Sequence, residues 1–221
     1  MIPPQQNSHF VAAMEQLFDV YKRPYNKSRP VVCMDETPKQ LIKEVRKSLP
    51  IMPGFEKRVD YEYSRSGVCN VFMVNEPLAG KRFTKVTGQR TKKDWAQLVR
   101  YICDKLYPNA ETITLIMDNL ASHSAAALYE TFEPVEAKRI SDRLEFVYTP
   151  NHGSWLNMAE IELNVLTKQC LCRRIDSLKK VKTEVKAWQN HRNIKDTKIK
   201  WQFTTKDARV KLHRLYPSIN N

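Results

Sequence analysis

The sequence predicts an α/β fold in which helices flank a mixed β-sheet. Residues 58–64 and 68–75 have the alternating or β-branched composition of strands, and Arg65-Ser66-Gly67 between them suggests a hairpin. The nearly continuous apolar run at residues 112–119 is typical of a strand covered on both faces. Helical segments alternate with the later strands, and this order favours a mixed sheet between helices.

Three more segments complete the predicted sheet. Residues 31–36, VVCMDE, predict a short buried strand that ends in two acids. Residues 81–87, KRFTKVT, extend the hairpin, and residues 143–150, RLEFVYTP, form a late strand. Residues 37–58 contain three prolines and show no clean hydrophobic period, so we expect a loop with at most one helical turn there.

Helices are predicted where apolar residues recur every three or four positions. The clearest case is DWAQLVRYICDKLY at residues 94–107, with Asp94 as the expected cap. Ser8 and Ser122 are the expected caps of two others. The remaining predicted helices cover residues 8–21, 122–129, 156–174, 177–191 and 205–215.

The chain is strongly basic. Its 221 residues include 37 Lys or Arg against 24 Asp or Glu, which gives a formal net charge of +13 and a pI near 9.5. Because the basic residues are clustered, this excess favours a polyanionic partner, nucleic acid first, over a merely soluble basic protein. The sequence shows no signal peptide and no long apolar run, so we expect a cytoplasmic protein without a membrane partner.

The cysteines do not predict a metal site or a disulfide framework. There are five, an odd number, and no pair has the C-x-x-C spacing of a zinc site. Cys170 and Cys172 would point apart on a helix. We expect reduced thiols.

Three acidic residues lie where a buried element ends. Asp35 follows VVCM, Asp118 follows TITLIM, and Glu160 falls in the first turns of the helix at residues 156–174. Functional groups of open α/β sheets gather at the carboxyl ends of strands. Converging carboxylates repel one another unless a cation binds them, and Mg²⁺ or Mn²⁺ prefers carboxylate oxygen. Two such ions about 3.5–4 Å apart can activate a water or a 3′-hydroxyl towards a phosphodiester. Taken singly, each acid has an alternative as a cap or turn residue.

The surroundings of these acids resemble a known family. VVCMDE, TLIMDNLASH and TPNHGSWLNMAEIEL resemble the three catalytic blocks of DDE transposases, in the insertion-sequence 630 branch of the mariner superfamily. DYEYSRSG, GKRFTKVTGQRTKKDWA and WQFTTKDARVKLHRLYP are similar to the same family. The blocks occur in the expected order and the resemblance covers nearly the whole chain.

The resemblance implies an RNase H-like fold, a five-stranded mixed sheet with helices on both faces. Carried over position by position, the catalytic acids are Asp35, Asp118 in D-N-x-x-x-H, and Glu160 in L-N-x-x-E. The same three residues would bind two Mg²⁺ ions, with Mn²⁺ as a substitute. Glu162 is rotated about 200° around the helix from Glu160 and should face away from the metals. Glu36 is expected to be a neighbour of the site and not a ligand.

The resemblance also implies a reaction and partners. DNA would be hydrolysed at transposon ends, and the freed 3′-hydroxyl would attack target DNA without a covalent enzyme intermediate. The partners would be double-stranded DNA, as transposon ends and target, and a second copy of the chain bound to that DNA. Only about thirty residues precede VVCMDE, too few for the helix-turn-helix region of full-length relatives. The chain would therefore be either a catalytic fragment or one half of a protein whose recognition half is encoded separately. A bacterial, DNA-associated protein is implied.

These inferences divide the chain into three parts. Residues 1–30 would form an N-terminal helix and linker, residues 31–176 the RNase H-like catalytic core, and residues 177–221 a basic helical extension packed on the core.

Further residues have both a functional and a structural interpretation. His123 and Asn119 follow Asp118 and would contact the phosphate or orient a water, or else serve as helix-start and turn residues. Trp155 would wedge against a base or, as we favour, anchor its helix in the core. The basic candidates for DNA contact have solvated surface as their alternative. They are Lys81, Arg82, Lys85, Arg90, Lys92, Lys93, Arg173 and Arg174.

Two other functions fit the same acids. One is an RNase H-fold nuclease that cuts DNA without strand transfer. The other is a catalytically silent DNA-binding derivative of a transposase, against which the retention of all three acids argues.

Overall fold

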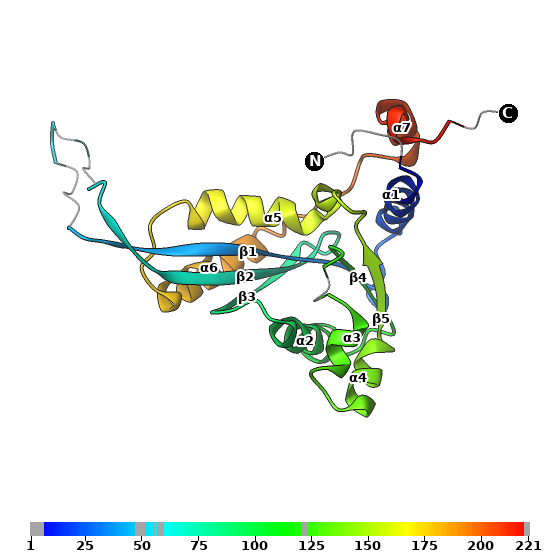
Figure 1. Cartoon of the computed structure of the whole chain (residues 1–221), viewed down its shortest axis with the longest axis horizontal. Coiled ribbons are helices and arrows are strands. Elements are labelled where there is room, and N and C mark those ends of the chain that lie inside the picture. Colours follow the sequence, from blue (N-terminus) through cyan, green and yellow to red (C-terminus); the bar gives the residue numbers. More distant parts are fainter. Residues whose placement is uncertain (1–6, 47–51, 55, 57–59, 121–122, 219–221) are drawn as a thin grey trace.

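The computed structural model describes residues 7–46, 52–54, 56, 60–120 and 123–218. Over these ranges the chain forms a five-stranded sheet with the strand order β3-β2-β1-β4-β5 (Figure 1). The strands are β1 (Val31–Glu44), β2 (Tyr63–Glu76), β3 (Lys81–Thr87), β4 (Ile113–Met117) and β5 (Leu144–Tyr148). Strand β2 is antiparallel to β1 and β3, whereas β4 is parallel to β1 and β5. The predicted mixed sheet is confirmed, with β1 at its centre.

Helices cover both faces of the sheet, as predicted. They are α1 (Ser8–Tyr21), α2 (Lys92–Tyr101), α3 (Ala125–Tyr129), α4 (Pro134–Ser141), α5 (Met158–Leu166), α6 (Leu178–Ile194) and α7 (Thr205–Lys211). Side chains of β1 alternate between two cores. Cys33 packs in a core with α1, α5 and α6, whereas Val32 and Met34 pack in a core with α2, α3 and α4. No helix in the described part of the chain is long and apolar enough to cross a membrane.

Strand β1 is much longer than predicted. The expectation of a loop from residue 37 is wrong, because β1 continues to Glu44 and pairs with β2 along its length. Pro38 misled the prediction, since proline usually interrupts strands. It is tolerated here because β4 pairs with β1 only over Val31–Cys33, so the other side of β1 needs no strand partner beyond Cys33.

The predicted hairpin at Arg65-Ser66-Gly67 is a β-bulge within one strand. Gln40 pairs with Val68 and Ile42 pairs with Arg65, so two residues of β2 lie opposite one residue of β1. Gly67 has a φ of +104°, which an L side chain rarely adopts. The turn signal in the sequence therefore corresponds to a β-bulge, and β2 continues through it as a single strand.

Several helix starts differ from the prediction. Asn7 caps α1 in place of Ser8, and Thr91 caps α2, with Asp94 completing a reciprocal capping box. Ser122 lies outside the described residues. Helix α4 was not predicted, although Pro134 at its first position is a common helix-start signal. Helices α2 and α5 both continue into a π-helical turn, Ile102–Leu106 and Thr167–Leu171.

Helix α6 covers the outer edge of β3. The backbone N–H of Thr84 donates to Gln189 Oε1 at 2.8 Å, and that of Arg82 donates to Asn193 Oδ1 at 2.9 Å. Asn193 Nδ2 in turn donates to the carbonyl of Arg82 at 2.9 Å. Side-chain amides thus satisfy an edge that would otherwise be open to another strand, and they fix α6 against the sheet.

Candidate active site

The three predicted acids come from three elements that meet beside β1. Asp35 lies on β1, two positions beyond Cys33, which is the last β1 residue paired with β4. Asp118 directly follows β4, and Glu160 lies in the first turn of α5. Burial is the main cause that raises the pKa of Asp35 to about 7, and the charges of Glu36, Asp118 and Glu160 add to it. Strand β1 pairs in parallel with β4, so Asp118 follows a strand that adjoins the strand of Asp35.

Asn157 determines where α5 begins. Its Oδ1 accepts a hydrogen bond from the N–H of Ala159 at 3.0 Å and so caps the helix. Its Nδ2 donates to the carbonyl of Met34 at 2.8 Å. Met34 is the first β1 residue beyond the β4 pairing, so this amide takes the place of a strand partner. Fully buried Asn157 thus holds the helix of Glu160 against the strand of Asp35.

Asn157 is the asparagine of the L-N-x-x-E motif, and the sequence analysis did not predict a role for it. The available signal was its residue type, because asparagine directly before a helix is a favoured cap. The second contact, to Met34, joins positions 123 residues apart and has no local signature.

His123 lies at the centre of a buried polar cluster. Its Nδ1 is 2.6 Å from Asp118 Oδ1, its Nε2 is 3.4 Å from Glu36 Oε2, and its ring stacks on Trp95. Burial alone would lower the pKa of His123, but the hydrogen bond to Asp118 and the charge of Glu36 raise it above its usual value. Arg90 Nη1 reaches Glu36 Oε1 at 3.2 Å. The cluster thus links Asp118, through His123 and Glu36, to a surface arginine.

Glu36 is a neighbour of the acids with one unsatisfied oxygen. Its side chain is buried, and burial raises its pKa, although the charge of His123 opposes that effect. Glu36 Oε2 has no hydrogen-bond partner among the described residues. Asn119 is exposed and lines a cavity of about 350 Å³ together with Tyr148 and Asn151. Trp155 packs against the hydrophobic core, as favoured.

Most of the basic candidates for DNA contact lie at the surface. Lys81, Arg90, Lys92, Lys93 and Arg173 are exposed, and Lys85 and Arg174 are half-buried. Several already have protein partners. Lys92 pairs with Glu130, Arg173 pairs with Glu184, and Arg174 lies over the ring of Tyr63.

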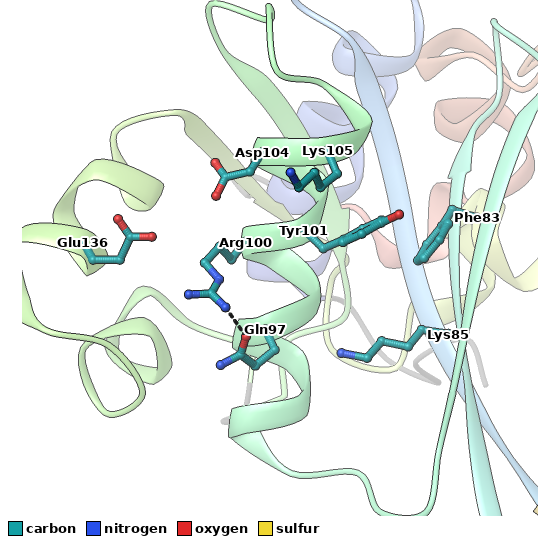
Figure 2. A pocket seen from close by; sticks show the side chains of 8 residues that line it. All are labelled: Phe83, Lys85, Gln97, Arg100, Tyr101, Asp104, Lys105 and Glu136. Atoms are coloured by element: carbon teal, nitrogen blue, oxygen red, sulfur yellow. Dashed lines mark hydrogen bonds between the residues drawn. The ribbon is translucent and has the colours of Figure 1, made fainter.

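A cavity of about 580 Å³ lies between α2 and β3, apart from the three acids (Figure 2). Half-buried Lys85 lines it, and burial lowers the pKa of this lysine. Phe83 stacks on Tyr101 along its wall, with ring centroids 4.8 Å apart. None of Asp35, Asp118 and Glu160 lines this cavity, so its size does not mark the site.

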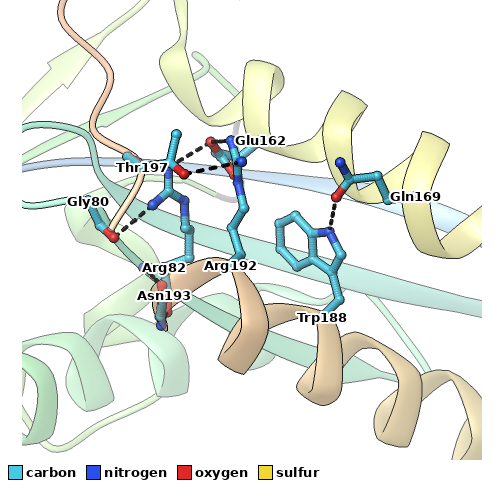
Figure 3. A network of polar contacts seen from close by, with 8 residues as sticks. All are labelled: Gly80, Arg82, Glu162, Gln169, Trp188, Arg192, Asn193 and Thr197. Carbon is cyan, nitrogen blue, oxygen red and sulfur yellow. Dashed lines mark hydrogen bonds and ion pairs between the residues drawn. The ribbon is translucent and has the colours of Figure 1, made fainter. Parts of the chain in front are cut away.

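Arg82 requires a correction, because its side chain is fully buried and cannot reach DNA in this fold. Its guanidinium pairs with Glu162, as Figure 3 shows. Arg192 of α6 pairs with the same carboxylate. Burial would raise the pKa of Glu162, but hydrogen bonds from Arg192 and Arg82 lower it below its usual value. Glu162 is therefore an ionised, buried partner of two arginines, directed to a different set of groups from Glu160.

The three acids are of the residue types that bind a divalent cation, but their side chains are not grouped as metal ligands among the described residues. No group of three or more His, Cys, Asp or Glu side chains in the described ranges is arranged to hold a metal ion. Their character nevertheless fits one. Asp35 is buried, and the charges of Asp118 and Glu160 add to the cost of ionising it. A hard cation bound by carboxylate oxygen would relieve that cost.

The five cysteines are all free thiols, as expected. Cys172 is exposed, and the others are buried. Burial raises the pKa of Cys33 to about 12. The thiols therefore pack as apolar groups in this fold and add no ligands to the site.

Comparison with known proteins gives a family and a fold. The model of a family described as DDE superfamily endonuclease matches residues 30–182. A crystal structure of the Mos1 mariner paired end complex with Mn is similar at 18% identity and a TM-score of 0.58, over 89% of this chain and 61% of that chain. The Mos1 Strand Transfer Complex is similar at 16% identity and a TM-score of 0.59, over 89% and 60%. No curated protein gives a significant match.

The catalytic domain of Mos1 mariner transposase is similar at 15% identity and a TM-score of 0.55, over 90% of this chain and 99% of that chain. At such identities the likeness shows the fold, which is the RNase H-like fold expected from the sequence. The chain spans about 61% of the length of the chain in the Mn complex.

Proposed function

The chain belongs to the DDE superfamily endonucleases, and from this premise we propose that it is the catalytic domain of a DNA transposase. The proposed reaction is cleavage of DNA at transposon ends, followed by transfer of the freed 3′-hydroxyl to target DNA. The insertion-sequence 630 branch of the mariner superfamily is the proposed subgroup. The wider reaction rests on the extent of the family match, residues 30–182, and on the motifs that surround the acids.

The observation that carries the proposal is that Asp35, Asp118 and Glu160 lie on adjoining elements. Strand β1 of Asp35 pairs in parallel with β4, which Asp118 directly follows, and Asn157 joins the start of α5, the helix of Glu160, to β1. Asp118 and Glu160 are 83 and 125 positions from Asp35 in the sequence. Ionised carboxylates are costly to bring together, and a fold that collects them normally has a cation to bind. We therefore assign Asp35, Asp118 and Glu160 as the catalytic acids and as ligands of two Mg²⁺ ions, for which Mn²⁺ would substitute. When bound, such ions activate the attacking oxygen and stabilise the leaving oxygen of a phosphodiester.

The neighbouring residues have supporting roles in this proposal. His123 holds Asp118 by the 2.6 Å contact and fixes which carboxylate oxygen remains free. Glu36 in turn faces the other ring nitrogen of His123 and is itself paired with Arg90. Asn157 sets the position of Glu160 by joining α5 to β1. In this proposal, the contribution of these neighbouring residues to the reaction is to hold the three carboxylates in place.

DNA binding is assigned to the exposed cations. Phosphate contacts from lysine and arginine position a duplex without reading its sequence. The proposed contact residues are Lys81, Lys85, Arg90, Lys92, Lys93, Arg173 and Arg174. Recognition of specific ends would need a separate helix-turn-helix region, and pairing of two ends would need a second copy of the chain on DNA.

A strand-transfer assay tests the proposal. The chain is mixed with a pre-cleaved transposon-end duplex, a target plasmid and Mg²⁺, because pre-cleaved DNA avoids dependence on a separate recognition region. Joined product that disappears in Asp118→Asn supports the proposal. Asp19→Asn removes an exposed carboxylate elsewhere and should leave joining unchanged.

The same assay separates the two competing functions. Cleavage of plasmid without joining would indicate a nuclease that lacks strand transfer. Binding of DNA with neither activity, by protein whose circular dichroism shows it to be folded, would indicate a silent derivative. Either result would overturn the proposed transposase activity.

A further inference from the structure

The carboxylate of Glu162 is bound on both oxygens by two arginines from different elements (Figure 3). Oε1 accepts from Arg82 Nη2 at 2.8 Å and from Arg192 Nη2 at 3.0 Å. Oε2 accepts from Arg192 Nε at 3.1 Å. The side chains of Glu162 and Arg82 are completely buried, and Arg192 is half-buried. This ion cluster joins α5 to β3 and α6.

The two arginines are themselves held in place. Arg82 Nη1 donates to the carbonyl of Gly80 at 2.7 Å, and Arg82 Nη2 also donates to the carbonyl of Thr197. The backbone of Arg82 is bonded to Asn193 of α6. A guanidinium fixed at several points cannot follow a carboxylate that moves, so the cluster has one favourable geometry.

A second contact between the same helices lies further along. Trp188 Nε1 of α6 donates to Gln169 Oε1 at 2.9 Å, in the π-helical turn that continues α5 (Figure 3). Helix α6 therefore contacts the α5 segment at two places. Trp188 contacts Gln169, 19 residues earlier in the sequence, and Arg192 contacts Glu162, 30 residues earlier. Two contacts on one side of a helix fix its rotation as well as its distance.

We propose that Glu162 is a positioning residue for Glu160, and that α6 through Arg192 is part of the device that orients the catalytic helix. The inference rests on the proposed function of Glu160. Two residues correspond to about 200° of helical rotation, so fixing Glu162 on one side directs Glu160 to the opposite side. Asn157 holds the start of the same helix against β1. Together the Asn157 cap and the ion cluster restrict both the translation and the rotation of α5 relative to the sheet.

The family match ends at residue 182, so Arg192 and Trp188 lie beyond it. The part of α6 that carries Arg192 therefore contributes to the proposed geometry of the site from outside the matched segment. A purely structural cluster would stabilise the fold without affecting how cations bind at the acids. A positioning cluster must affect cation binding even in protein that remains folded.

The experiment compares Glu162→Gln and Arg192→Lys with the wild-type chain. Glu162→Gln keeps the size of the side chain and loses its charge. Arg192→Lys keeps the charge and loses the planar fork of donors. The controls are Asn164→Ala on α5 and Asn190→Ala on α6, both exposed. The readouts are Mn²⁺ affinity by electron paramagnetic resonance, affinity for the pre-cleaved duplex, and the joining rate across Mg²⁺ and Mn²⁺ concentrations.

We expect both variants to bind the duplex within twofold of wild type. Their Mn²⁺ affinity should fall at least tenfold, and joining in Mg²⁺ should fall at least tenfold with partial recovery in excess Mn²⁺. Folded variants with Mn²⁺ affinity within twofold of wild type would overturn the inference. If Glu162→Gln fails to fold, the milder Arg192→Lys decides.

The outcome is distinguishable from failure of the proposed function. Wild-type chain that binds Mn²⁺ without joining DNA contradicts strand transfer, while the comparison of Mn²⁺ affinities still decides the role of Glu162. Wild-type chain that binds no Mn²⁺ overturns both.

Discussion

The side-chain amide of Asn157 donates a 2.8 Å hydrogen bond to the carbonyl of Met34, the residue directly before Asp35. This bond lies where β4 stops pairing with β1, and it joins the helix of Glu160 to the strand of Asp35. The Asn157 side chain thus binds a β1 carbonyl just beyond the last residue of β1 that pairs with β4. The position of the acids depends on it.

Replacing Asn157 should therefore weaken both the fold and the site. Asn157→Ala removes a helix cap, worth about 1 kcal/mol, and leaves a buried carbonyl unsatisfied, which costs about 1–3 kcal/mol. Urea unfolding should show a loss of about 2–4 kcal/mol, the sum of those two effects. Asn157→Asp keeps the cap acceptor but cannot donate to Met34. Because it also places an unpaired carboxylate at a fully buried position, it should be at least as destabilising as Asn157→Ala, whereas Asn164→Ala, exposed on the same helix, should be neutral.

Divalent cations should stabilise the folded chain through the three acids. Mn²⁺ at about 100 times its dissociation constant should add about 2.7 kcal/mol, equivalent to a rise in Tm of about 5–10 °C for a domain of this size. Differential scanning fluorimetry measures the shift. Asp35→Asn, Asp118→Asn and Glu160→Gln should each lose most of it. An equal shift in these variants would place the ions elsewhere.

Lys81 and Arg82 are adjacent in sequence, but substitution of Lys81 should change DNA affinity, whereas substitution of Arg82 should change the stability of the fold. Lys81→Ala removes an exposed charge, so DNA affinity should fall and the slope of log affinity against log salt should decrease by about 1. Its Tm should not change. Arg82→Ala leaves Glu162 with a single arginine in a buried setting, which should cost about 3–5 kcal/mol of folding free energy. Fluorescence anisotropy across salt concentrations and thermal unfolding separate the two effects.

Glu145 should make the fold sensitive to acid. The hydrogen bond from Arg23 is the main cause that lowers its pKa to about 2, and Thr114 adds a second bond. Because the folded pKa lies below the ordinary value of 4.5, the contribution is present above pH 4.5 and is lost as pH falls towards 2. Both partners are more than one-third exposed, so solvent screening makes the effect small.

The corresponding measurement is urea unfolding of wild type and Glu145→Gln across pH. The variant should be less stable at pH 7, and the two curves should converge as pH is lowered below 4.5. A difference that stays constant down to about pH 2 would mean that the charge of Glu145 is not the cause.

Much of this molecule could be predicted from local pattern. The apolar run before Asp118 and the periodicity of residues 8–21 correspond to β4 and α1. The three acids were singled out because Asp35 and Asp118 follow apolar runs and Glu160 falls in the first turns of a predicted helix, properties visible in the sequence. Pro38 and Gly67 gave misleading signals, because a proline at an unpaired strand side and a glycine in a bulge resemble a loop and a turn.

The remaining features depend on contacts that sequence does not display. A buried arginine and a solvated lysine look alike in a basic run, so Arg82 was grouped with Lys81. Its partner Glu162 is 80 residues away, and Arg192 is 30 residues beyond that. Burial of charge is decided by pairing, and pairing over such separations requires the folded chain.

The ion cluster also determines when α5 can acquire its second anchor during synthesis. Strands β1, β2 and β3 are consecutive and can pair early, whereas the cluster needs Arg192. Until that residue leaves the ribosome, α5 lacks the anchor that α6 provides. For the transposase proposed above, cutting competence would therefore appear only once translation has passed α6, and a nascent polypeptide would leave nearby DNA intact.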